Sequence, residues 1–444
     1  MNPFNQLVSE KLNSYLGDNP KSIFELKFIL ALSGGIDSMA LFQSLKDLGL
    51  NFYTVHFNHQ YNSQSNDVSM SLINLIKNSN SKKHFNISLN LRKVNNFESD
   101  SRYKRYFHLE NIRRRLSSDF ILTAHHLDDQ IETLHMRKIQ HTHWSNSLGI
   151  RERMDFIRRP LLTLYKSQII AFAKEKKILW NEDLTNRDNS FLRNKARNKV
   201  IPKLLTKNPD YANELLSQQT INKNKFEQIV SKIKKTNFSI QRFSYGLSLN
   251  FIKYIAFCEV GKKLIIQSLI RDIFNIKSFQ FSYKNWKNLF IYIESSKKRN
   301  SLFSISKDIS IYRSDSKIYI VNNDELNSKE LIINDCCNWF GGIITVSPLK
   351  EFNADFNKFM ASLPENLECK VRQWKFADTY ISATSGNQRK VSDLFINKKL
   401  NYIQKRIQPI VTDSKDNILW IPGLDHASII YNHKFKKYSW ALMK

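Results

Sequence analysis

The sequence predicts an α/β protein whose first part is a doubly wound parallel sheet, followed by a mainly helical part and a small mixed α/β part. Three observations carry this prediction. Short apolar runs alternate with helical segments over residues 27–177. The apolar strands among these runs fit burial on both faces of the sheet. Apolar residues then recur mainly with the period of a helix, and the alternation typical of strands appears only after residue 300.

The first part contains five runs of strand type, each followed by a polar stretch or a helical segment. Strands are expected at residues 27–32, 51–58, 84–91, 119–126 and 155–162. Helices are expected from about Asp37 to Leu48, and at residues 68–78, 98–118, 127–138 and 167–177. Regular alternation of this kind favours parallel strands with helices on both faces of the sheet.

The pattern changes after residue 200. Helices are expected at residues 201–235, with Pro202 and Pro209 as breaks, and at residues 251–276. In residues 301–324 apolar and polar residues alternate as in two paired strands around a polar turn. A mixed α/β pattern follows. We therefore expect three domains, at residues 1–210, 211–328 and 329–444.

The composition is that of a globular protein without a membrane segment. Hydrophobic residues make up 41% of the chain, enough for buried cores. No apolar run approaches the ~20 residues that span a bilayer, and the N-terminus has no signal-like segment. The four cysteines show neither metal-ligand nor disulfide-framework spacing; they are Cys258, Cys336, Cys337 and Cys369. We expect a cytoplasmic, reduced protein with no membrane association.

The charge balance points to a polyanionic partner. Lys and Arg number 68, Asp and Glu number 40, and the formal net charge is +28. Such a bias favours binding to nucleic acid. A lysine-rich, AT-biased genome is the alternative explanation and stays open at this point.

A glycine-rich loop follows the first strand and carries the clearest chemical signal. Its residues are Ser33, Gly34, Gly35, Ile36, Asp37 and Ser38. Glycines allow close approach of a ligand, and the following helix points free N–H groups at the loop. The serine hydroxyls can donate hydrogen bonds. An ordinary turn capped by Asp or Ser is the alternative.

The loop lacks the lysine of a nucleoside-triphosphate P-loop. No lysine occurs until Lys46, so the loop suits a pyrophosphate that leaves as a unit. That predicts attack at the α-phosphate of a nucleotide and an adenylated intermediate. Asp37 is a poor phosphate ligand because it is acidic, and it is better interpreted as a Mg²⁺ ligand, directly or through water.

Acidic residues follow the fourth strand, in the sequence "HHLDDQIET". Asp129 and Glu132 stand three apart and share a helical face, which suits a cationic amino-acid side chain. Acids that complement the helix dipole are the alternative. His125 ends a parallel strand and is expected to face the ligand crevice and contact the nucleotide, although strand-end histidines are often merely half-buried. Whether Asp128 binds Mg²⁺ stays open.

Two arginines at helical spacing lie near residue 195. Arg193 and Arg197 stand four apart on one predicted face, with no acid between them. This arrangement suits the phosphates of ATP or the backbone of a tRNA. A solvated basic face is the alternative.

Several motifs together resemble the PP-loop ATP pyrophosphatases, a family with a Rossmann-like fold, and within it the tRNA(Ile)-lysidine synthetases. They are "SGGIDS", "VHFNHQYNSQSNDV", "ESDSRYKRYFHL", "LTAHHLDDQIETLHMR", "RRPLL", "WNEDLTNRDNSFLRNKARNKVIPKL" and "KVSDLFINKKL". The resemblance is specific over residues 25–205 and patchy beyond. Two departures stand out: "KIQHTHWSNSLGI" replaces a glycine-rich stretch, with glycine only at 149, and "EDLTN" replaces an acidic–Pro–Ser–Asn sequence.

The resemblance implies an AMP-forming carbon–nitrogen ligase. It would join lysine to C2 of the wobble cytidine of an isoleucine tRNA of the CAU anticodon type, through an adenylated tRNA, with release of pyrophosphate. It also implies that ATP and Mg²⁺ are needed and that the later domains position and bind tRNA. Residues 33–38 and His125 would bind ATP. Arg105, Asp129 and Glu132 would bind lysine, with Arg105 on its α-carboxylate, and with Asp37 would form the catalytic set. No protein partner is implied, and a homodimer stays open.

Other functions are less consistent with the residues. A PP-loop tRNA thiolase needs a sulfur carrier or persulfide-forming cysteines, and residues 1–257 contain no cysteine. An amidotransferase-type synthetase would need a glutaminase nucleophile, usually cysteine, and Met1 is followed by Asn. A non-catalytic basic tRNA-binding protein would not be expected to keep both "SGGIDS" and "DDQIET" intact.

Overall fold

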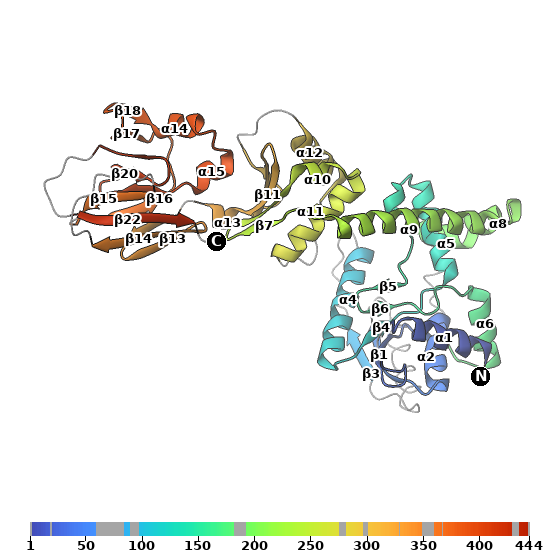
Figure 1. Cartoon of the computed structure of the whole chain (residues 1–444). Coiled ribbons are helices and arrows are strands. Elements are labelled where there is room, and N and C mark those ends of the chain that lie inside the picture. Colours follow the sequence, from blue (N-terminus) through green and yellow to red (C-terminus); the bar gives the residue numbers. More distant parts are fainter. Residues whose placement is uncertain are drawn as a thin grey trace. The chain divides into compact units, whose positions relative to one another are not determined.

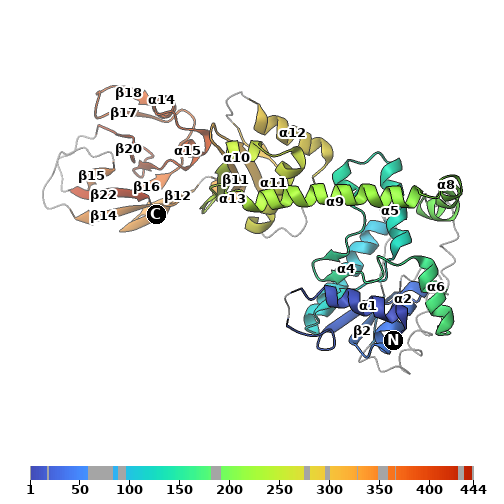
Figure 2. The same ribbon diagram turned by 45° about the vertical axis from the view of Figure 1, so that its right-hand side comes forward.

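The computed structural model divides into two compact units, Met1–Glu227 and Gln228–Lys444 (Figures 1 and 2). It describes residues 2–17, 20–58, 84–88, 97–181, 192–274, 281–295, 301–327, 329–348, 359–365, 367–428 and 435–442. Within these ranges no helix has the length and apolar character needed to cross a membrane. The predicted helix at 68–78 lies outside the described residues. The division predicted at residue 328, inside the second unit, stays a prediction.

The first unit consists of a mixed but mostly parallel sheet and the helices around it. Its strands are β1 (Lys27–Ala31), β2 (Asn51–Asn58), β3 (His84–Ser88), β4 (Phe120–Leu122), β5 (Arg153–Met154) and β6 (Ile157–Arg158). Its α-helices are α1 (Pro3–Ser14), α2 (Ile36–Asp47), α4 (Phe97–Arg115), α5 (Leu127–Ile139), α6 (Lys166–Glu175), α7 (Leu192–Lys195) and α8 (Ile201–Lys207). A π-helical turn (Ala196–Val200) joins α7 to α8, and α9 (Tyr211–Lys235) follows.

The strand order β3-β2-β1-β4-β6-β5 confirms the predicted doubly wound sheet. All neighbouring pairs are parallel except β5 with β6. One face is covered by a core that includes α1, α2 and α6, and the other by a core that includes α4 (Figure 1). The chain reverses its direction of winding between β1 and β4, and ligands bind at such switch points.

The register at the switch point brings the two motif-bearing segments together. Leu30 of β1 pairs with Leu122 of β4. The strands are parallel, so residues 33–38 after β1 and residues 125–132 after β4 emerge from the same edge of the sheet. The fold therefore places the glycine-rich loop beside the acidic helix α5.

The fifth strand is shorter than its apolar pattern predicted. Residues 155–162 were expected as one strand, but β6 has only two residues and forms a tight hairpin with β5. Asp155 occupies the turn with a φ of 50°. Pro160 cannot donate a hydrogen bond to a ladder, so the strand does not extend through it.

The loop after α5 closes with glycine only at position 149. Gly149 has a φ of +70°, which favours glycine. The amide of Gln130 from α5 donates to the carbonyl of Ile150 and accepts from its N–H, and Gln219 of α9 donates to the carbonyl of Leu148 at 2.8 Å. Two glutamine side chains and one glycine therefore fasten this loop against α5.

Replacing Gly149 with alanine is expected to destabilise the first unit by about 2–4 kcal/mol, since a left-handed backbone is strained and two amide contacts must move. A Cβ there would lie closer than 3.0 Å to the amides of Gln130 and Gln219. Gly49 also has a positive φ, +66°, but no atom within 4 Å of its Cβ position, so Gly49→Ala should cost only about 1 kcal/mol. Urea unfolding of both variants measures the difference. Equal losses would show that the glutamine contacts contribute nothing.

The second unit combines short helices with antiparallel sheets. Its helices are α10 (Phe251–Ile255), α11 (Glu259–Phe274), α12 (Tyr283–Glu294), α13 (Asn323–Leu326), α14 (Val391–Asn397) and α15 (Tyr402–Ile407). Its strands up to residue 322 are β7 (Gln241–Phe243), β8 (Gly246–Asn250), β9 (Phe303–Ser304), β10 (Ile309–Arg313) and β11 (Lys317–Asn322). The predicted strand pair within 301–324 is confirmed by β10 and β11, and it belongs to a five-stranded sheet of order β7-β8-β11-β10-β9.

The C-terminal part of this unit holds three further sheets, which is consistent with the mixed α/β structure predicted there. The strands are β12 (Glu330–Ile333), β13 (Cys336–Trp339), β14 (Gly342–Pro348), β15 (Met360–Pro364), β16 (Cys369–Arg372), β17 (Thr379–Ile381), β18 (Gln388–Lys390), β19 (Ile410–Thr412), β20 (Ile418–Ile421), β21 (Asp425–His426) and β22 (Phe435–Leu442). All four cysteines lie in this unit as free thiols.

Candidate active site

The glycine-rich loop turns tightly between β1 and α2 and is fastened by Ser38. Gly34 has a φ of 88°. The buried hydroxyl of Ser38 accepts hydrogen bonds from the N–H groups of Ser33 (3.2 Å) and Gly34 (3.1 Å) and donates to the carbonyl of Gly35 (2.9 Å). Ser33 is exposed, with its hydroxyl 3.0 Å from that of Ser38. Ser33 therefore faces solvent at the loop, whereas Ser38 holds the loop in shape.

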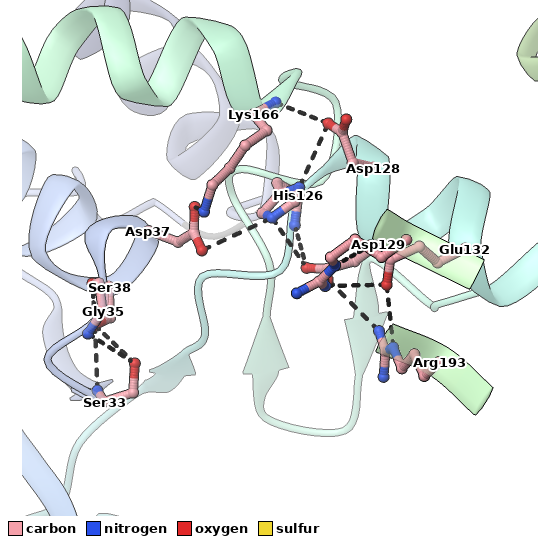
Figure 3. A network of polar contacts seen from close by, with 11 residues as sticks. Ser33, Gly35, Asp37, Ser38, His126, Asp128, Asp129, Glu132, Lys166 and Arg193 are labelled. Carbon is pink, nitrogen blue, oxygen red and sulfur yellow. Dashed lines mark hydrogen bonds and ion pairs between the residues drawn. The ribbon is translucent and has the colours of Figure 1, made fainter. Parts of the chain in front are cut away.

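The first turn of α2 carries Ile36 and Asp37 beside this loop. The N–H groups of a first helical turn have no intrahelical acceptor and suit an anion. The Asp37 carboxylate is paired with the ammonium of Lys166, the first residue of α6, at 2.5 Å (Figure 3). Sequence reasoning missed Lys166, which lies 129 residues further along the chain and in no recognised motif.

Three aspartates surround the buried His126, the N-cap residue of helix α5 (Figure 3). Its Nε2 lies 3.7 Å from Asp37 and 3.6 Å from Asp129, and its Nδ1 lies 3.6 Å from Asp128. Burial lowers the pKa of His126, but the three carboxylates outweigh burial and leave that pKa above its ordinary value. His126 therefore links the acid beside the loop with the acids of α5.

The α5 carboxylates predicted to hold lysine are paired with the arginines predicted to hold phosphate. Asp129 accepts from Arg197 at 2.9 Å and lies 3.5 Å from Arg193. Glu132 accepts from Arg193 Nε at 3.1 Å and from both Nε and Nη2 of Arg197. Asp129 and Glu132 are buried, with residue exposures of 9% and 3%. Acids and arginines thus form one cluster in which each charge is compensated.

His125 lies half-buried at the end of β4, among positive charges. Its Nδ1 lies 3.0 Å from the hydroxyl of Thr123. Burial is the main reason that the pKa of His125 is lowered to about 4; Asp129 opposes the shift, and the charges of Arg159, Arg102 and Arg193 add to it. The imidazole is therefore neutral at physiological pH and can accept a hydrogen bond.

The pKa of His125 predicts a pH dependence of stability. The ordinary pKa is 6.5 and the folded value is about 4, so unfolding takes up a proton between these pH values. The free energy of unfolding should therefore decrease as the pH falls from about 6.5 to about 4. His125→Asn should lose this part of the pH dependence. Denaturant unfolding across that pH range tests it, and an unchanged pH profile in the variant would contradict the assignment.

Helix α4 contributes arginines near His125 and the end of β4. Arg105 is half-buried on α4, one turn from Arg102, whose charge acts on His125. Arg159 follows β6 and is 1% exposed; it donates to the hydroxyl of Tyr106 at 3.2 Å and to the carbonyl of Arg151. The α5 acids form ion pairs with Arg193 and Arg197.

The residues fit a magnesium ion that is shared with a nucleotide better than a site made of protein ligands alone. Within the described ranges, no group of three or more His, Cys, Asp and Glu side chains is arranged to hold a metal. Mg²⁺ is commonly bound by one or two carboxylates together with substrate phosphates. Asp37 offers one such carboxylate beside the loop, with 27% of its side chain exposed.

Comparisons with known proteins show which proteins this chain resembles. A PP-loop domain family matches residues 5–204. A tRNA(Ile)-lysidine synthase of Aster yellows witches'-broom phytoplasma is 30% identical over 93% of this chain and 93% of its own length. The tRNA(Ile)-lysidine synthase of Enterococcus faecalis is 23% identical, over 89% and 90%. Among solved structures, the U34-tRNA thiolase NcsA from Methanococcus maripaludis covers 50% of this chain and 79% of its own, with 15% identity and a TM-score of 0.41.

Proposed function

Because this chain belongs to the tRNA(Ile)-lysidine synthase family, we propose that the loop after β1 binds ATP for tRNA adenylation and that the α5 acids receive lysine. The enzyme is an ATP-dependent tRNA-modifying ligase, and its relatives are named for lysidine synthesis rather than for thiolation. The substrates that we propose are lysine and an isoleucine tRNA of the CAU anticodon type. The single observation that supports this assignment best is the pairing of β1 with β4, which brings loop and acids to one edge of the sheet.

The first half-reaction activates the wobble cytidine. Its C2 oxygen attacks the α-phosphate of ATP, the bond between the α- and β-phosphates breaks, and pyrophosphate leaves. The N–H groups of the first α2 turn stabilise the negative charge on the phosphates. Asp37 would hold Mg²⁺, which supplies Lewis-acid stabilisation of that charge. The product carries AMP as a good leaving group on C2.

The second half-reaction joins lysine to the activated carbon. Asp129 and Glu132 bind the ε-ammonium, Arg105 binds the α-carboxylate, and the amine attacks C2 as AMP leaves. The ammonium must lose a proton, and the carboxylate pair would accept or relay it. Since Arg193 and Arg197 now occupy these carboxylates, lysine binding requires an exchange in which the arginines turn to phosphate groups.

The proposed reaction is tested by product analysis. The enzyme is incubated with a CAU-anticodon isoleucine tRNA, ATP and radiolabelled lysine, and the nucleosides of the tRNA are separated. We expect lysine on the wobble cytidine, with one AMP and one pyrophosphate released per adduct. A quadruple variant with all four cysteines replaced by serine should form the same product, since these cysteines lie outside the first unit. Sulfur incorporation, or no lysine adduct, would refute the proposal.

A further inference from the structure

Lys166 brings a positive charge to a loop that has no lysine of its own. Its backbone N–H donates to Asp128 Oδ2 at 2.7 Å, and its ammonium lies 2.5 Å from Asp37 Oδ1. One end of the residue is therefore held by the acidic helix α5, and the other end reaches the first turn of α2. The next lysine after the loop in the sequence, Lys46, lies in the last turn of α2.

The chemistry at this loop calls for such a charge. When pyrophosphate leaves, the electron pair of the broken bond stays on the former bridging oxygen, and no proton need be transferred. Pyrophosphate carries more negative charge than the N–H groups of one helix turn usually compensate. A mobile ammonium on a long side chain can follow that oxygen.

We propose that Lys166 is the pyrophosphate-binding cation of this enzyme. In this structure its ammonium neutralises Asp37, and in the presence of ATP it moves to the oxygens of the β- and γ-phosphates and remains on the leaving pyrophosphate. Asp37 is then free to hold the metal ion. This inference rests on the proposed use of the loop for ATP, and it adds a residue that neither the motif nor the relatives' names indicate.

The protein contains a matched control for a purely structural ion pair. Lys176, at the end of α6, lies 3.1 Å from Asp47, at the end of α2, so the same two helices are joined by a Lys–Asp pair at both ends. The exposures are similar: the lysine side chains are 32% and 33% exposed, and the aspartates 27% and 20%. Loss of either pair removes a comparable helix contact, but only Lys166 lies at the loop.

The experiment measures binding of inorganic pyrophosphate, and of ATP in EDTA, to the full-length protein by calorimetry. Lys166→Met should raise both dissociation constants about 10- to 100-fold, the usual effect of removing one charged hydrogen bond to an anion. Lys176→Met should bind both ligands like the wild type, and Lys166→Arg should recover most of the affinity. The loss should persist when Lys166→Met is made in an Asp37→Asn background, which removes repulsion from an unpaired carboxylate.

The outcomes separate this inference from the proposed function. If the wild type binds both ligands and Lys166→Met binds them equally well, Lys166 serves only as an ion-pair partner and the inference is wrong. The same holds if the loss disappears in the Asp37→Asn background. If the wild type binds neither ligand, the loop is not an ATP site, and the proposed function is refuted together with the inference.

Discussion

Replacing Asp37 with alanine is expected to reduce tRNA-dependent pyrophosphate release about a hundredfold or more, because the transition state loses the carboxylate proposed to hold Mg²⁺. Asp37 lies in the first turn of α2, beside the loop, and its present partner is Lys166. The measurement is the initial rate of pyrophosphate release with substrate tRNA and saturating ATP.

Asp47 provides the control for this substitution. It lies at the other end of α2 and is also paired with a lysine of α6, Lys176. Asp47→Ala should release pyrophosphate at close to the wild-type rate, although it loses hydrogen bonds from Asn5 and Gln43 and some stability with them. A wild-type rate in Asp37→Ala would remove Asp37 from the chemistry.

Replacing Glu132 with glutamine is expected to raise the KM for lysine about tenfold or more and to slow lysine transfer about a hundredfold. Glutamine keeps the shape of the side chain but removes the negative charge that attracts the ammonium and accepts its proton. The KM for ATP should change much less. Initial rates of lysine incorporation, measured over a range of lysine and ATP concentrations, test this.

Glu110 is a suitable control because two arginines also bind it. It accepts hydrogen bonds from Arg113 and Arg114 within α4. Glu110→Gln should leave both KM values unchanged, and its thermal unfolding shows how much stability such a pair contributes. If Glu132→Gln changes the KM for ATP and not that for lysine, Glu132 positions Arg193 and Arg197 for phosphate instead.

The sheet of the first unit could be predicted because its signal is local. The strands β1 and β4 lie in apolar runs that are followed by a helical pattern, and right-handed parallel connections leave little choice of topology. A strand was expected to start at Asp155, which instead lies in the turn between β5 and β6, because the apolar residues that follow Asp155 hide the turn. The strand β8 was missed because its ladder with β11 joins residues about 70 positions apart, and β7 pairs only with β8.

Only those residues of the candidate site that lie in a recognisable sequence motif could be predicted. Residues 33–38 and the acids of α5 are recognisable from residue type and spacing. Lys166 is not, because its role follows from the packing of α6 on α2. The pairing of Glu132 with Arg193 and Arg197 could not be predicted either, because the arginines lie more than 60 residues further along the chain. The sequence pattern had assigned these arginines to phosphate groups.

A single-turnover experiment that follows tRNA adenylate and lysine adduct separately tests the proposed function most directly. We expect that Asp37→Ala forms neither species at a useful rate. Glu132→Gln should form adenylate at close to the wild-type rate and then accumulate it, because capture by lysine is slow. If Glu132→Gln instead fails to form adenylate, and supplied adenylated tRNA is captured by lysine at the wild-type rate, the α5 acids serve ATP and the lysine site lies elsewhere.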